Sequence, residues 1–112
     1  MATEEEVEAV LEQLMQRVSR IDPSYRAMLP TRRTIQAECP DIGAVYHATL
    51  RQGQISELQR GSATRADIRV RCSSDDLLLL ATGDLDPSVA YASDRLSIQA
   101  SMTDLLRLRA VL

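Results

Sequence analysis

The residue types that most often carry chemistry are few in this chain, and they stand far apart. His47 is the only histidine, so neither a multi-histidine metal site nor a His-paired catalytic set is available. The adjacent carboxylates Asp75 and Asp76 fall in the first turn of an expected helix, where the helix dipole accounts for them without a catalytic role. No G-x-S-x-G elbow surrounds Ser73 or Ser74. We therefore expect a protein that is not an enzyme and uses no metal and no cofactor.

Two cysteines and two arginine pairs are the remaining candidates. Cys39 and Cys72 fall in strand-like segments without C-x-x-C spacing or an obvious basic activator, so buried thiols are favoured over nucleophiles. A disulfide between them stays open. The pair Arg32-Arg33 and the alternating Arg69 and Arg71 are expected to be solvated, with attraction of anionic lipid headgroups as the weaker alternative.

Composition limits the class of protein. The 112 residues are expected to form a single domain, residues 1–112, and 45% of them are apolar, which argues against disorder. A net charge of -3 argues against a nucleic-acid partner. No segment approaches the ~20 apolar residues of a membrane span, and the N-terminus is acidic, unlike a signal peptide. We expect a cytoplasmic protein without stable membrane insertion. The basic residues are all arginine, which is typical of a GC-rich, bacterial genome.

The first two thirds of the chain predict one helix followed by short strands. Thr3 and Glu6 form a capping box, and apolar residues then recur at helical spacing until Asp22-Pro23. Another short helical turn is expected at 25–29. Alternating apolar and polar residues then predict strands at 32–39, 44–51, 55–59 and 67–73. Tight turns between such strands indicate an antiparallel meander with one face in water.

The last third predicts helices around one more strand. Ser73 or Ser74 caps a helix with the leucine run 77–80, and Gly83 ends it in a left-handed conformation. Asp86-Pro87 starts a second helix that continues to about Tyr91. A strand over 95–100 and a final helix that begins at Ser101 follow. The whole is an α+β fold whose helices gather on the apolar face of one sheet.

The leucine run raises the question of function. A helix with leucine on every side cannot rest one face in water, so it is either covered outside as well as inside or lines a space that something else fills. The near-absence of aromatic residues, three tyrosines alone, leaves flexible aliphatic walls that suit a ligand cavity and an ordinary core equally.

This C-terminal order resembles the sterol carrier protein type-2 family of lipid-binding domains. The resemblance is carried by Asp75-Asp76-Leu77 through Gly83, Leu85-Asp86-Pro87, Ala90-Tyr91, Leu96-Ser97-Ile98, Leu105 and Leu108. It is specific over the last forty or so residues, and the order of the upstream segments is compatible. Two departures are Asp94 and Ala100, where that family usually has glycine. Aspartate tolerates a left-handed turn, whereas Ala100 could reshape a ligand space beside its strand.

The resemblance implies a five-stranded, mostly antiparallel sheet covered by helices on one face, with an apolar tunnel between the layers. It also implies binding or transfer of an acyl chain, phospholipid, sterol-like or other polycyclic molecule without chemistry. The residues that it implies as the tunnel lining are Leu77, Leu80, Ala81, Leu85, Tyr91, Leu96, Ile98, Leu105 and Leu108.

Two hypotheses follow. In the first, a small apolar ligand is the partner, and the leucine helix and the final helix roof a cavity over the strands at 67–73 and 95–100. In the second, side chains or a second copy fill the same space, and the fold is a protein-interaction or dimerisation module without a ligand cavity. In the second hypothesis the partner is a homodimer mate or an enzyme.

Overall fold

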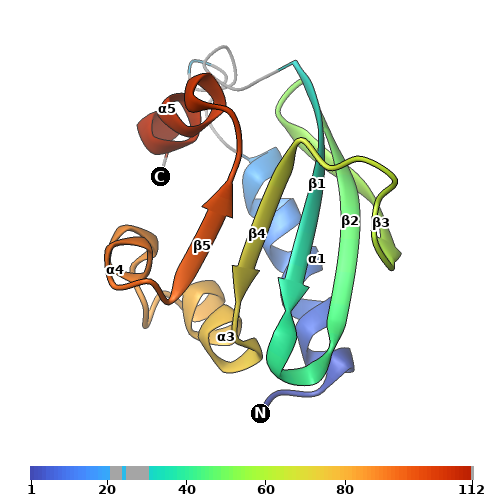
Figure 1. Cartoon of the computed structure of the whole chain (residues 1–112), viewed down its shortest axis with the longest axis vertical. Helices are drawn as coiled ribbons and strands as arrows, with labels where there is room; N and C mark the ends of the chain where they lie inside the picture. The colour runs from blue at the N-terminus through green and yellow to red at the C-terminus, as the bar shows by residue number, and fades with distance from the viewer. Residues whose placement is uncertain (21–23, 25–30, 112) are drawn as a thin grey trace.

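The computed structural model describes residues 1–20, 24 and 31–111, without the side chains of residues 108, 110 and 111. The expected helical turn at 25–29 lies outside the described residues. The elements follow one another along the chain as Figure 1 shows. They are α1 (Glu4–Ser19), β1 (Arg32–Cys39), η1 (Pro40–Ile42), β2 (Ala44–Arg51), β3 (Gln54–Arg60), β4 (Ile68–Cys72), α3 (Ser74–Thr82), α4 (Pro87–Ala92), β5 (Leu96–Gln99) and α5 (Met102–Val111).

The first helix begins where the capping box predicts. The Thr3 hydroxyl accepts a hydrogen bond from the Glu6 amide, and the Glu6 carboxylate accepts one from the Thr3 amide. These two bonds satisfy amides that the first turn of a helix leaves without partners. Of the apolar stripe on α1, only Val7 is fully buried, and the rest of the stripe is half-buried.

The sheet is mixed, with the strand order β3-β2-β1-β4-β5. β1, β2 and β3 form the expected antiparallel meander, and β5 pairs with β4 in the antiparallel sense. β4 pairs with β1 in parallel, however, so the prediction of one continuous meander was wrong at this strand. Three of the four pairings are antiparallel, which agrees with the expected mostly antiparallel sheet.

The connection 61–67 explains why β4 does not continue the meander. The Ala63 amide donates to the side-chain oxygen of Gln36, and the Thr34 amide donates to the Asp67 carboxylate, each at 2.9 Å. These bonds hold the connection against β1 and bring β4 to its far side. They also bury Gln36, which the alternation had placed on the wet face.

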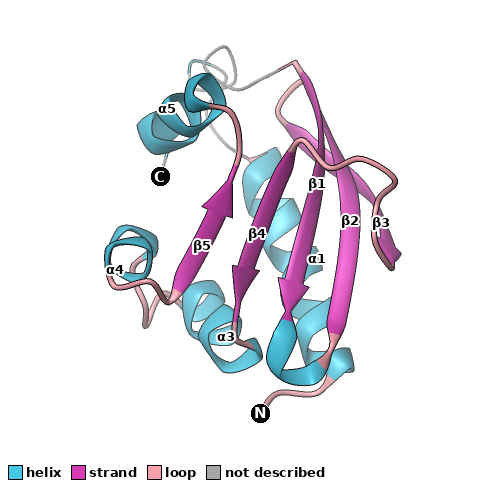
Figure 2. Cartoon of the chain, viewed as in Figure 1, coloured by secondary structure: helices cyan, strands magenta, loops and turns pink. Residues whose placement is uncertain are grey.

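The helices divide into two groups around the sheet. In Figures 1 and 2, α1 and α3 lie together behind one face of the sheet, whereas α4 and α5 lie beside the edge strand β5. The alternation predicted for β2 is confirmed, since Tyr46, Ala48 and Leu50 are buried while the residues between them are half-buried. The covered face of the sheet is therefore the one that faces α1 and α3.

The local signals of the last third are confirmed. The Ser73 hydroxyl caps α3, and Gly83 ends it with a φ of 85°. Asp86 caps α4 ahead of Pro87. Asp94 has a φ of 61°, so aspartate does occupy the expected left-handed turn.

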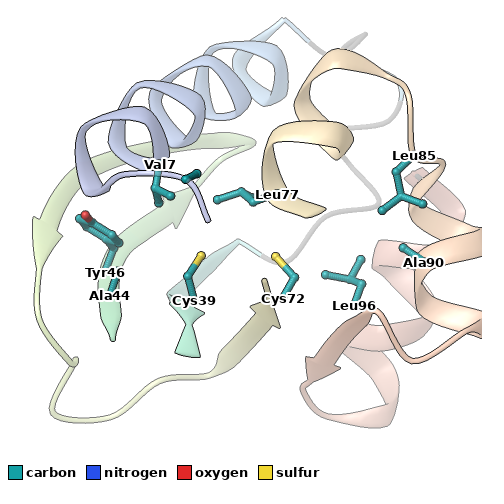
Figure 3. Packing of buried hydrophobic residues seen from close by; sticks show 10 residues of the cluster. Val7, Cys39, Ala44, Tyr46, Cys72, Leu77, Leu85, Ala90 and Leu96 are labelled. Carbon is teal, nitrogen blue, oxygen red and sulfur yellow. The ribbon is translucent and has the colours of Figure 1, made fainter. Parts of the chain in front are cut away.

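A compact core lies at the N-terminal end of α1, where Figure 3 shows Val7 and Leu77 facing the sheet. At the start of α3, Ser74 is fully buried and is held by its neighbours. Its amide and its hydroxyl both donate to the Asp41 carboxylate, and its hydroxyl accepts from the Ala2 amide. This end of the molecule is close-packed and its polar groups are paired.

One arginine departs from the expectation of solvated strand ends. Arg33 lies opposite Leu50, hence on the covered face of the sheet, and its guanidinium forms an ion pair with the buried Asp104 of α5. The sequence places Arg33 next to a truly exposed Arg32, and local pattern does not distinguish the two.

Candidate functional site

An apolar cavity of about 180 Å³ lies between α1 and the sheet, and we call it the inner cavity. α1 forms its roof, and β1 and β2 form most of its floor. Its lining consists of Leu11, Leu14, Met15, Val18, Ile35, Ala37, Glu38, Cys39, Tyr46, His47, Ala48, Ile55, Leu58, Val70, Cys72 and Leu77. A lining of this kind excludes water and favours apolar contents.

The floor of the inner cavity is unusual for the centre of a sheet. Ile35 and Ala37 lie on the covered face of β1, the central strand, and Val70 lies on the neighbouring strand β4. All three are only half-buried, although side chains at such positions are normally among the most enclosed of a domain. The described helices thus do not close over the middle of the sheet.

A β-bulge in β3 supplies one wall. The register of β3 against β2 shifts by one residue between His47 and Thr49, and Glu57 there has a φ of 62°. Strict alternation would place Ile55 and Leu58 on opposite faces of the sheet. The extra residue turns both toward α1, where both line the inner cavity.

The inner cavity adjoins an open groove of about 480 Å³, which we call the α1–β3 groove. Its lining consists of Glu12, Met15, Gln16, Ser19, Gln54, Ile55, Ser56 and Leu58. Met15, Ile55 and Leu58 line both spaces, so these three side chains separate the apolar interior from solvent. Methionine and leucine can change rotamer at small cost, which makes this boundary a suitable entrance.

The other end of α1 is fastened to the sheet. Glu8 accepts hydrogen bonds from the Tyr46 hydroxyl at 3.1 Å and from the Arg60 guanidinium at 2.5 Å. The bond from Arg60 lowers the pKa of Glu8, and burial raises the pKa of Tyr46 to about 12. α1 is therefore tied to β2 and β3 near its N-terminus, while its C-terminal half borders the groove.

The two cysteines lie side by side in the floor. Both are free and buried, which agrees with the expectation of reduced thiols. Figure 3 shows their sulfur atoms pointing toward Leu77 and the helix layer. The hydrogen bond between the thiols lowers the pKa of Cys39, and the same contact together with burial raises the pKa of Cys72.

The residues that the resemblance implied as lining are spread over several places. Leu77 lines the inner cavity. Ala81, Leu85 and Leu96 are buried, Leu80, Ile98 and Leu105 are half-buried, and Tyr91 is 49% exposed. The side chain of Leu108 lies outside the described residues. Contact of any of these residues with a ligand stays a prediction.

The expected roof also differs from the observed one. α5 contributes none of the described lining residues, and its Asp104 is paired with Arg33 of β1. Sequence reasoning missed the lining from α1 and β3. The apolar stripe of α1 could have indicated that this helix lines an apolar space. No sequence pattern indicated the bulge at Glu57.

Groups suited to catalysis are sparse in the described residues. No cluster of three or more His, Cys, Asp or Glu residues able to hold a metal ion occurs among them. The Nδ1 atom of His47 lies 2.8 Å from the Gly61 carbonyl oxygen. Within the same part of the chain, no helix has the length and apolar character needed to cross a membrane.

Comparison with known proteins identifies the family. The model of the SCP-2 sterol transfer family matches residues 9–112. The chain belongs to this family. The resemblance drawn from the C-terminal residues is thereby confirmed and extended over α1 and the sheet. No curated protein matches the chain.

Solved structures confirm the fold. The crystal structure of sterol carrier protein 2 like 2 from Aedes aegypti matches with a TM-score of 0.70 and 17% identity, over 96% of each chain. A solution structure of the palmitated form of SCP2L2 from Aedes aegypti has a TM-score of 0.67 and 16% identity, over 93% of this chain and 91% of that one.

The same fold also occurs within a larger enzyme. The sec-alkylsulfatase Pisa1 from Pseudomonas sp. matches with a TM-score of 0.60 and 21% identity, over 85% of this chain but 15% of its own. The fold of this chain thus recurs both in a small protein and in part of an enzyme.

Proposed function

We propose that this SCP-2 family protein binds an apolar molecule between α1 and the sheet and carries it without chemical change. The observation that supports this most directly is the half-buried state of Ile35, Ala37 and Val70 at the centre of the sheet, beneath an apolar cavity. A protein with an ordinary core would close this space, because each apolar group left uncovered forfeits the stability that burial gives.

The size of the space indicates how a ligand would fit. A cavity of about 180 Å³ is smaller than the roughly 300–1,000 Å³ of typical ligand sites. A long chain would therefore fill the inner cavity with its apolar end and continue into the α1–β3 groove. Each buried methylene contributes about 0.8 kcal/mol, which offsets the entropy of ordering the chain. The palmitated form of a structural relative has been solved, which accords with a long alkyl chain as the apolar part of the ligand.

Native mass spectrometry of the freshly purified protein, before and after organic extraction, tests the proposal. We expect a bound mass that extraction removes. A variant that fills the floor, Ala48→Leu, is expected to lose affinity for the neutral apolar dye Nile red because the added side chain occupies the inner cavity. Ala9→Leu adds the same atoms at an exposed position of α1 and serves as the matched control.

Equal dye binding by the two variants, with both folded by circular dichroism, would remove the inner cavity as the binding site. The second candidate, an interaction module, is favoured by exposed apolar side chains on α4 and α5, namely Val89, Tyr91, Met102 and Leu106. A dimer in solution that Leu106→Asp converts to a monomer, together with no dye binding, would support this candidate instead.

A further inference from the structure

The rim of the α1–β3 groove has a distinctive charge pattern. Its polar members are Glu12, Gln16, Ser19, Gln54 and Ser56. Glu12 is the one charged residue among the described residues that line the groove, and no arginine lines it there. A polar group at the outer end of a bound chain would therefore meet amides, hydroxyls and one carboxylate.

Glu12 has no partner among the described residues, unlike the acidic side chains that are held by arginines. Glu8, one turn earlier on α1, is neutralised by Arg60, and Asp76 and Asp104 are paired with Arg95 and Arg33. In the described part of the chain, Glu12 forms no ion pair and no hydrogen bond. Its carboxylate remains available to a ligand at the rim.

The helix itself adds to the negative potential of the rim. The groove runs along the C-terminal half of α1, where the last carbonyl groups carry the negative end of the helix dipole. Arg17 lies in the last turn, but it is exposed and is not part of the groove lining. A ligand carboxylate at this position would face like charge on one side and find no cation among the lining residues that the structure describes.

The hydrogen-bond donors and acceptors at the rim further narrow the choice of polar group that the ligand can carry. The amides of Gln16 and Gln54 and the hydroxyl of Ser56 can each donate or accept, so they do not discriminate between polar groups. An ionised carboxylate only accepts, so Glu12 selects a partner that donates a hydrogen bond. A hydroxyl or ammonium group satisfies it, whereas a carboxylate does not.

We propose that the ligand of this protein is a long apolar molecule that ends in a hydrogen-bond-donating, non-anionic group, a hydroxyl or an ammonium, held at the rim by Glu12. The proposal rests on the function proposed above. It places the apolar end of the ligand in the inner cavity, past Met15 and Leu58, and the polar end in the α1–β3 groove. It makes Glu12 a specificity-determining residue for this ligand class.

Three probes with one chain length test the proposal: dodecan-1-ol, dodecylammonium and dodecanoate. Each probe is titrated as a competitor of bound Nile red at neutral pH and ~0.15 M salt, where charges further apart than roughly 8 Å are screened. We expect the alcohol and the ammonium to bind about three- to fivefold more tightly than the carboxylate, the range that exposed charge contacts produce.

The variant Glu12→Gln is expected to reduce dodecylammonium affinity about threefold and to raise dodecanoate affinity. Glu5→Gln is the matched control, because it removes the same charge from an exposed position of α1 outside the groove. The control should leave the order of the three affinities unchanged.

The outcomes separate this proposal from the function on which it rests. Binding of all three probes with dodecanoate equal or tightest, or with an order that Glu12→Gln leaves unchanged, would overturn the role of Glu12 while leaving the carrier function standing. Binding of none of the probes, together with no dye binding, would overturn both.

Discussion

Arg33 and Asp104, far apart in the sequence, join the central strand of the sheet to the last helix through two hydrogen bonds. Arg33 Nε lies 2.8 Å from Asp104 Oδ2, and Arg33 Nη2 lies 3.2 Å from Asp104 Oδ1. Asp104 is 3% exposed, and its own amide donates to the Ser101 hydroxyl. The buried carboxylate therefore ties the start of α5 to the start of β1.

The variant Asp104→Asn should be less stable than the wild type at neutral pH. The hydrogen bonds from Arg33 hold the pKa of Asp104 below its ordinary value of 3.8. A lowered pKa in the folded state contributes stability that is complete above this ordinary value and is lost as the pH falls through the lower, folded-state pKa. Urea denaturation at about pH 7 and about pH 3 should show a clear difference in midpoint at the higher pH and a smaller one at the lower.

Other carboxylates also titrate in this range, so the comparison is made between variants rather than between pH values alone. Glu5→Gln removes an unpaired carboxylate and should follow the wild type at both pH values. A midpoint for Asp104→Asn equal to that of the wild type at neutral pH would contradict the anchoring role of the pair.

Substitution of Glu57 by glycine and by valine should change the stability of the protein differently. Its φ of 62° is left-handed, a conformation that costs most side chains roughly 1–2 kcal/mol and glycine almost nothing. We expect Glu57→Gly to keep or raise the free energy of unfolding, and Glu57→Val to lower it by about 1–2 kcal/mol. The valine variant should also bind Nile red more weakly, because the bulge turns Ile55 and Leu58 into the inner cavity.

Thermal or urea denaturation measures the first effect, and dye titration the second. Gln59→Val is the control, since Gln59 is an exposed residue of the same strand with no left-handed backbone. If valine were tolerated equally at both positions, the bulge would not depend on the conformation of Glu57.

The cysteines should be slow to react with iodoacetamide in the folded protein and should differ from each other. Burial shields both thiols, and their mutual hydrogen bond lowers the pKa of Cys39 while it raises that of Cys72. Because the thiolate is the reactive form, Cys39 should be modified first. Peptide mapping by mass spectrometry at about pH 8, with and without urea, should show slow modification at Cys39 in the folded state and rapid modification of both in urea.

Rapid modification of both cysteines without urea would mean that the floor of the inner cavity opens to solvent. Equal rates at the two positions in the folded protein would contradict the asymmetry of the pair.

Local sequence determined much of the fold. The capping box at Thr3, the stop at Gly83 and the start at Asp86-Pro87 each lie where the pattern predicted. These features depend on backbone groups within a few residues of one another, so a short stretch of sequence contains all that decides them. The alternation in β2 likewise identified its buried face.

Tertiary structure decided the features that join distant residues. The parallel pairing of β4 with β1, the buried state of Gln36 and the partner of Arg33 all depend on which strands and helices meet, and no local period encodes this. The inner cavity belongs to the same class. The sequence by itself determined the family, the elements and an apolar interior. The packing of α1 over the bulged strand β3 decided where that interior stays open. This is because a cavity is a property of the space between elements and not of any one of them.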